Sequence, residues 1–173
     1  MILDEAYVQF ISPKALPGYD SISLLGRYSN LAILRTFSKY YALAGMRVGY
    51  VLAHPNVVSA VKSVQTTFPV SQPAVAAAIA VLTENERVRH GLNATVMSQK
   101  EEIARILTDR GYPYVESQAN FIWLPLGDRS AEFARLCARA GILVRQFGND
   151  GVRITIGQPG LPDALASALD SES

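Results

Sequence analysis

The stretch 36–50 constrains this chain more than any other, because it places one lysine among hydroxyl-bearing and small residues. It reads Thr-Phe-Ser-Lys-Tyr-Tyr-Ala-Leu-Ala-Gly-Met-Arg-Val-Gly-Tyr, with Lys39 near its start and Arg47 near its end. Apolar runs at 31–34 and 48–52 predict that Lys39 follows one strand and precedes another. Partial burial lowers the pKa of an amine, and an unprotonated amine can attack a carbonyl carbon. Lys39 is therefore a candidate nucleophile.

The same stretch carries groups that bind a phosphate. The hydroxyls of Thr36 and Ser38 can donate hydrogen bonds, and the guanidinium of Arg47 offers a two-pronged donor. For a lone Ser-Lys pair the ordinary alternative is a basic loop after a strand, with no chemical role. Residues elsewhere in the chain decide between these interpretations.

A second motif, Asp4-Glu5-Ala6-Tyr7, directly follows the apolar residues 1–3. An apolar segment that ends abruptly in aspartate is typical of a buried parallel strand that reaches an active site at its carboxyl end. The carboxyl ends of parallel strands share one edge of a sheet. We therefore expect Asp4, Tyr7 and Lys39 to meet in one crevice.

Together the two motifs resemble the signature of fold-type I pyridoxal-phosphate aminotransferases, most closely the histidinol-phosphate and aromatic amino acid branch. The resemblance implies that Asp4 pairs with the pyridine nitrogen of the cofactor and that Tyr7 meets its phenolic oxygen. Lys39 would hold the cofactor, and Arg47 would bind its phosphate. One position departs from the family: the residue after the lysine is usually Ala or Ser, and Tyr40 would crowd the cofactor.

Three further segments, Asn120-Phe121, Val144-Arg145 and 151–157, resemble elements of the small domain in the same branch. An arginine in an apolar strand is costly to bury unless an anion meets it, and Arg153 is such a residue. The resemblance implies that Arg153 binds the substrate α-carboxylate, with Asn120 also at the substrate, whereas a structural salt bridge is the alternative. For Arg145 it implies a contact with a substrate phosphate, and an exposed strand arginine is an equal alternative.

The pattern along the chain predicts an α/β protein that corresponds to the C-terminal half of the transferase fold. We expect part of the large cofactor-binding domain at 1–65, a bridging helical region at 66–110 and a small α+β domain at 111–173. Predicted strands lie at 1–4, 31–36, 48–53, 114–115, 121–124, 142–144 and 152–156, the first three in a parallel sheet. Predicted helices lie at 55–64, 131–140 and 162–169, with either one helix over 72–110 or two that break at Gly91.

Composition excludes several classes of protein. With 173 residues, 49% hydrophobic and 18% charged, the chain is globular, and its net charge of +1 gives no electrostatic case for nucleic acid or an anionic membrane. The longest apolar run, 74–82, is far shorter than the roughly 20 residues of a membrane span. No secretory signal is evident, so we expect a cytoplasmic location. Cys137, the only cysteine, lies on an apolar helix face, and the two histidines form no metal-ligand pattern.

The resemblance implies transfer of an amino group between histidinol phosphate or an aromatic amino acid and 2-oxoglutarate, in histidine or other amino-acid biosynthesis, by a homodimer. A pyridoxal-phosphate decarboxylase on the same scaffold is one alternative. A non-catalytic cofactor-binding module is another, although the chain shows no basic helix-turn-helix pattern of a regulator. Only the second half of a family member is matched. The phosphate-binding loop, the aromatic residue that stacks on the ring, an asparagine and the N-terminal arm are missing. We therefore expect a fragment, a truncated gene product or one piece of a split enzyme, poor or inactive alone.

Overall fold

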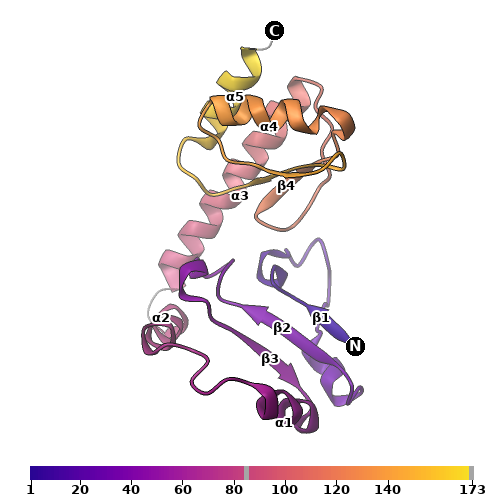
Figure 1. The fold of residues 1–173 in the computed structure, drawn as a ribbon, viewed down its shortest axis with the longest axis vertical. Coiled ribbons are helices and arrows are strands. Elements are labelled where there is room, and N and C mark those ends of the chain that lie inside the picture. Colours follow the sequence, from indigo (N-terminus) through magenta and orange to yellow (C-terminus); the bar gives the residue numbers. More distant parts are fainter. Residues whose placement is uncertain (84–85, 172–173) are drawn as a thin grey trace. The chain divides into compact units, whose positions relative to one another are not determined.

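The computed structural model describes residues 1–83 and 86–171, which divide into two compact units, Met1–His90 and Gly91–Ser173. Each unit contains one three-stranded sheet (Figure 1). The α/β class expected from the sequence is confirmed. The division into regions 1–65, 66–110 and 111–173 concerns the roles of these parts in a complete enzyme and stays a prediction.

The first sheet has the order β1-β2-β3, with β1 at Ile2–Asp4, β2 at Ala32–Thr36 and β3 at Gly49–Ala53. β1 and β2 are parallel, as predicted, but β3 runs antiparallel to β2, so the expectation of a wholly parallel sheet is wrong. Only residues 37–48 join β2 to β3, and their sole helical element is the short turn η3, Ala44–Met46. A parallel return usually needs an α-helix within a crossover of a dozen or more residues, and these 12 residues contain no α-helix, so the chain comes back antiparallel.

Short helical turns and two helices complete the described part of the first unit. The crossover from β1 to β2 contains the turns η1, Val8–Phe10, and η2, Ile22–Gly26. After β3 come α1, Pro55–Val64, and α2, Gln72–Thr83. The ring of His54 caps α1, since its Nδ1 accepts a hydrogen bond from the amide of Asn56 at 3.3 Å.

Helix α3 runs unbroken from Glu86 to Asp109. The region 72–110 thus contains two helices, α2 and α3, which confirms that alternative. Gly91 lies inside α3, so it is not the break between them. A single glycine costs a helix about 1 kcal/mol, which a helix of 24 residues can absorb when its later turns are packed. Ile103 and Leu107 on α3 are fully buried in the core of the second unit.

The second sheet is antiparallel with the order β4-β6-β5. Its strands are β4, Phe121–Leu124, β5, Arg145–Phe147, and β6, Gly151–Thr155. Helix α4, Ser130–Arg139, packs against β5 and β6, helix α5, Leu161–Asp170, packs against α4, and the buried side chains of both helices join the same core (Figure 1). The fully buried Cys137 of α4 belongs to this core, as predicted.

Two strand predictions in this unit need correction. The strand expected at 142–144 lies three residues later, as β5, because the apolar Ile142 closes α4 instead. Its amide donates to the carbonyl of Cys137 at 2.8 Å across Gly141, which has a φ of 73°. This is the bond pattern that ends a helix at a left-handed glycine, with an apolar residue behind it. The predicted strand at 114–115 is only a single bridge between Val115 and Trp123.

The two units differ in how much apolar surface they bury. The core of the second unit contains 16 buried residues. The described part of the first unit buries fewer apolar residues: Phe10, Leu31, Ala32, Ile33, Phe37, Ala74 and Ala78. Its Val64 and Phe68 are 84% and 91% exposed. None of the helices within 1–83 and 86–171 is long and apolar enough to cross a membrane.

Candidate active site

The predicted site residues of the first unit gather at the carboxyl ends of β1 and β2. Asp4 is the last residue of β1 and lies beside Leu34 of β2, since the strands are parallel and in that register. Its Oδ1 accepts a hydrogen bond from the amide of Ala6 at 3.0 Å, which turns the chain sharply after the strand. Asp4 is exposed, so its carboxylate is accessible at this edge.

Lys39 lies close to Tyr7. The lysine Nζ is 5.4 Å from the centre of the Tyr7 ring, and both side chains are half-buried. Tyr7 follows β1 directly and Lys39 follows β2, so the parallel pairing of these strands brings the two residues together although they are far apart in the chain. The structure thus brings together Lys39 and Tyr7, as the sequence predicted.

The turn that carries Lys39 is closed by its own hydrogen bonds. The Oγ1 of Thr36 accepts a bond from the amide of Ser38 at 3.0 Å, and the amide of Ala42 donates to the carbonyl of Lys39 at 3.0 Å. The amide of Leu43 returns to the carbonyl of Phe37 at 3.0 Å. The two predicted phosphate-binding hydroxyls therefore stand on one tight turn next to the lysine.

Arg47 lies at the end of the same loop in a left-handed conformation, with a φ of 53°. Its Nη1 donates to the carbonyl of Ala44 at 2.8 Å, and the side chain is exposed. A non-glycine residue in this region stores strain of order 1 kcal/mol or more, which is common at ligand-binding positions. Gly49 then lets β3 approach β2, because a Cβ there would lie 2.8 Å from the carbonyl oxygen of Arg35.

Tyr40, the residue that departs from the family pattern, belongs to an aromatic cluster. Its ring meets those of Phe10 and Tyr41 edge-on, each with centroids 5.4 Å apart, and Phe37 packs on Tyr41 at 4.9 Å. Such contacts stabilise by about 0.5–1.5 kcal/mol beyond burial. The ring therefore has a packing role in the first unit, and its effect on a bound cofactor stays a prediction.

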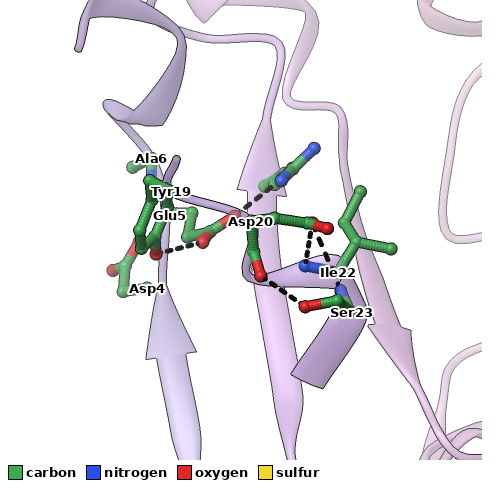
Figure 2. Close-up of polar contacts among 8 residues, drawn as sticks. Asp4, Glu5, Ala6, Tyr19, Asp20, Ile22 and Ser23 are labelled. Atoms are coloured by element: carbon green, nitrogen blue, oxygen red, sulfur yellow. Dashed lines mark hydrogen bonds and ion pairs between the residues drawn. The ribbon is translucent and has the colours of Figure 1, made fainter. Parts of the chain in front are cut away.

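Glu5 has a part in this region that the sequence reasoning missed, although the residue stands inside the first motif. It is only 4% exposed, and its carboxylate accepts hydrogen bonds from the Tyr19 hydroxyl at 2.6 Å and from Arg35 Nε at 2.8 Å (Figure 2). The signal for it was the charged Arg35 in an otherwise apolar strand, which needs a buried anion as its partner.

The predicted substrate residues of the second unit lie on its sheet. Arg153 on β6 stands directly opposite Arg145 on β5, so both side chains leave the same face. The Arg153 guanidinium lies 5.4 Å from the Phe121 ring centre, and that of Arg145 lies 4.8 Å from Phe147. Asn120 precedes β4, and its carbonyl accepts a bond from the amide of Ile156 at 2.9 Å.

Neither arginine has a carboxylate partner among the residues that the structure describes. The Nε of Arg153 is buried and makes no hydrogen bond within that part of the chain. A buried donor without an acceptor is costly, and a bound anion would satisfy it. The salt bridge considered as an alternative for Arg153 is thus not found among residues 1–83 and 86–171.

Comparisons with known proteins agree with this arrangement. The family model for aminotransferase class I and II matches residues 1–169. An aromatic amino acid aminotransferase from Mycobacteroides abscessus is 44% identical over 163 residues, which cover 94% of this chain and 46% of that protein. The chain therefore spans about half the length of the curated relatives it matches.

Solved structures give the same result. The histidinol-phosphate aminotransferase from Sinorhizobium meliloti, in complex with pyridoxal-5'-phosphate, is 32% identical with a TM-score of 0.84, over 99% of this chain and 49% of that one. A decarboxylase from Sulfurospirillum multivorans has a TM-score of 0.77 over 99% of this chain and 52% of its own, but at 24% identity it shows the shared fold alone. The chain belongs to the pyridoxal-phosphate-dependent aminotransferases of class I and II.

Proposed function

We propose that this chain is the lysine-bearing half of an enzyme that transfers an amino group between histidinol phosphate or an aromatic amino acid and 2-oxoglutarate. The observation that carries the proposal is the placement of the Lys39 amine 5.4 Å from the Tyr7 ring, beside the strand that ends in Asp4. These groups fit pyridoxal phosphate: an amine for its aldehyde, a carboxylate for its ring nitrogen and a phenol for its ring oxygen.

Each residue has a stated task in this proposal. Bound pyridoxal phosphate supplies an aldehyde and an electron-accepting ring. Asp4 holds a proton on the ring nitrogen, and Tyr7 donates to the ring oxygen. Thr36, Ser38 and Arg47 bind the phosphate, and Lys39 takes the proton from the substrate Cα and returns it.

The paired arginines support the choice of substrate. The phosphate of histidinol phosphate sits on the carbon attached to Cα, where an amino acid carries its α-carboxylate, so either anion would approach Arg153. Only the dianionic phosphate makes full use of the second guanidinium, at Arg145. We therefore place histidinol phosphate first and aromatic amino acids second, with Asn120 beside the substrate.

The experiment uses the completed chain, in which these 173 residues are joined to the portion of the Mycobacteroides abscessus relative that they do not match. Lys39→Ala should remove the absorbance of bound pyridoxal phosphate and lower amino transfer to 2-oxoglutarate by about 100- to 10,000-fold. The exposed Lys62 on α1 provides the control, and Lys62→Ala should retain both. Retention of both signals in Lys39→Ala would refute the proposal, and release of carbon dioxide in place of amino transfer would favour a decarboxylase.

A further inference from the structure

Glu5 and Arg35 form a buried ion pair next to the predicted cofactor residues. The Glu5 side chain is 2% exposed and that of Arg35 18%, and their Oε2 and Nε atoms are 2.8 Å apart. Glu5 directly follows Asp4, and Arg35 directly precedes Thr36. The pair therefore joins the two strand ends from which the predicted cofactor-binding residues emerge.

The environment keeps the Glu5 carboxylate charged. Burial by itself would raise its pKa, but hydrogen bonds directed at the carboxylate outweigh burial and leave the pKa below the ordinary value of 4.5. Tyr19 and Arg35 supply these bonds, and Ser21 contributes to the lowering although its Oγ falls short of hydrogen-bond geometry. The pKa of Tyr19 is raised in turn, because its hydroxyl donates to Glu5.

The loop that carries Tyr19 is itself fixed. Oδ1 of Asp20 accepts hydrogen bonds from the amides of Ile22 and Ser23 at 3.1 and 3.2 Å, and the Ser23 hydroxyl donates to the Asp20 carbonyl at 2.9 Å (Figure 2). These bonds hold the start of η2 and aim Tyr19 at Glu5. Three segments thus converge on one carboxylate: the end of β1, the end of β2 and this loop.

The pairing of β1 with β2 continues one residue beyond Asp4, at Glu5. The amide of Glu5 donates to the carbonyl of Leu34 at 2.9 Å, one step past the last paired residue of β1. On the other side, Arg35 is the cross-strand partner of Tyr50 on β3. Replacing a buried ion pair with apolar residues of similar volume is often neutral or stabilising, so stability alone is a weak reason for a buried Glu5 and a largely buried Arg35 here.

We propose that Glu5 and Arg35 are positioning residues, which hold Asp4 at the end of β1 in fixed register with the strand that leads to Lys39. This inference rests on the proposed function, because it assigns a purpose to the register of those two residues. A displacement of about 1 Å between groups that act together can cost on the order of 100-fold in rate. A directional ion pair resists such a displacement better than an apolar contact does.

The test separates positioning from stability by means of two variants of the completed chain. Glu5→Gln leaves Arg35 without its counter-charge, whereas Glu5→Met/Arg35→Met replaces both charges with apolar groups of similar length. The double variant should recover most of the thermal stability that Glu5→Gln loses, because no buried charge is left alone. If the pair positions Asp4, the double variant should still show at least tenfold lower kcat, with KM within about twofold of the parent protein.

A second readout does not depend on turnover. The circular dichroism of the bound pyridoxal phosphate band reports the orientation of its ring, and it should change in the double variant at equal cofactor content. Arg110→Gln, which breaks the more exposed ion pair between Arg110 and Asp170, is the matched control and should leave the band unchanged. Tyr19→Phe, which keeps the ion pair, should give an intermediate effect.

The outcomes distinguish this inference from the proposed function. Recovery of kcat and of the dichroism band together with stability in the double variant would overturn the positioning role while the function stands. If the parent protein shows no cofactor band, the proposed function fails. Hydrogen exchange on the 173-residue chain then tests only the premise that the pair holds β1 to β2: Glu5→Gln should speed exchange at β1 and β2 by at least tenfold relative to β4 and β6, and unchanged rates would overturn the inference whatever the fate of the function.

Discussion

Arg145 and Arg153 stand directly opposite each other on β5 and β6, with two guanidinium groups on one face of the sheet. Like charges in this position destabilise a sheet. Aromatic rings near both groups reduce the cost, since Phe147 lies 4.8 Å from the Arg145 guanidinium and 6.0 Å from that of Arg153. An anion bound by both arginines, as the proposed function requires, would offset the remaining repulsion.

The first prediction concerns this pair. In the completed chain, Arg145→Ala should lower kcat/KM for histidinol phosphate by the equivalent of about 1.5–3 kcal/mol, because a hydrogen bond from a charged group to the phosphate is lost. The kcat/KM for phenylalanine, which offers only its carboxylate, should fall much less. Arg139 of α4 is exposed, and Arg139→Ala is the control, which should leave kcat/KM unchanged for both substrates. Equal losses on both substrates for Arg145→Ala would remove this residue from the phosphate site.

The second prediction concerns Gly151, at the start of β6. A Cβ there would lie 2.2 Å from the carbonyl oxygen of Leu124 and 2.6 Å from the Trp123 ring, and the backbone atom cannot yield. Gly151→Ala should therefore destabilise the second unit by about 2–4 kcal/mol. Trp123, the only tryptophan, reports this unfolding by its fluorescence in urea.

Gly91 provides the opposite expectation for the same substitution. It lies within α3, with nothing within 4 Å of the added Cβ. Gly91→Ala should stabilise by roughly 0.5–1 kcal/mol, because alanine favours the helix. A gain in Gly151→Ala, or a loss in Gly91→Ala of similar size, would contradict the packing described for these positions.

The third prediction concerns pH. The pKa of Glu5 is lower in the folded protein than its ordinary value of 4.5, so the unfolded chain binds more protons at acid pH. The stability that Glu5 contributes is therefore fully present above about 4.5 and is lost as pH falls through the lower folded value. Hydrogen exchange at β1 and β2, corrected for the intrinsic effect of pH, should show this acid loss. Glu5→Gln should flatten the profile, and an equally steep profile in that variant would assign the acid loss to other groups.

Sequence patterns predicted the elements of this fold better than their pairing. The apolar periods located helices 55–64, 131–140 and 162–169 within a residue or two of their ends, because each has apolar residues at helical spacing, although only α4 and α5 bury that face. The direction of β3 depends on the connection between β2 and β3, and apolar periodicity carries no information about that connection. Ile142 was assigned to a strand because an apolar residue that closes a helix looks the same in sequence as one that begins a strand.

The candidate site shows a similar division. The closeness of Tyr7 and Lys39 was predictable, since each follows a strand that the sequence reveals and Asp4 ends the first of these strands. The opposition of Arg145 and Arg153 was not, because it depends on the register set by the turn from Gly148 to Asp150. The need of Arg35 for a buried anion was visible in the sequence, but its pairing with Glu5 was not, since 30 residues separate them and only the parallel pairing of β1 and β2 joins them.

The last prediction concerns the 173-residue chain alone, which should be a poor aminotransferase even with pyridoxal phosphate added. Catalysis requires the cofactor to be held within a fraction of an ångström, and a misplacement of about 1 Å costs on the order of 100-fold. The first unit leaves apolar side chains such as Phe68 and Val64 exposed at 91% and 84%, whereas the second unit encloses its own core. Amide exchange should accordingly be slower in β4 and β6 than in β1 and β2. The completed chain serves as the positive control for cofactor absorbance and turnover, and efficient amino transfer by the 173 residues alone would show that the first unit needs no further support.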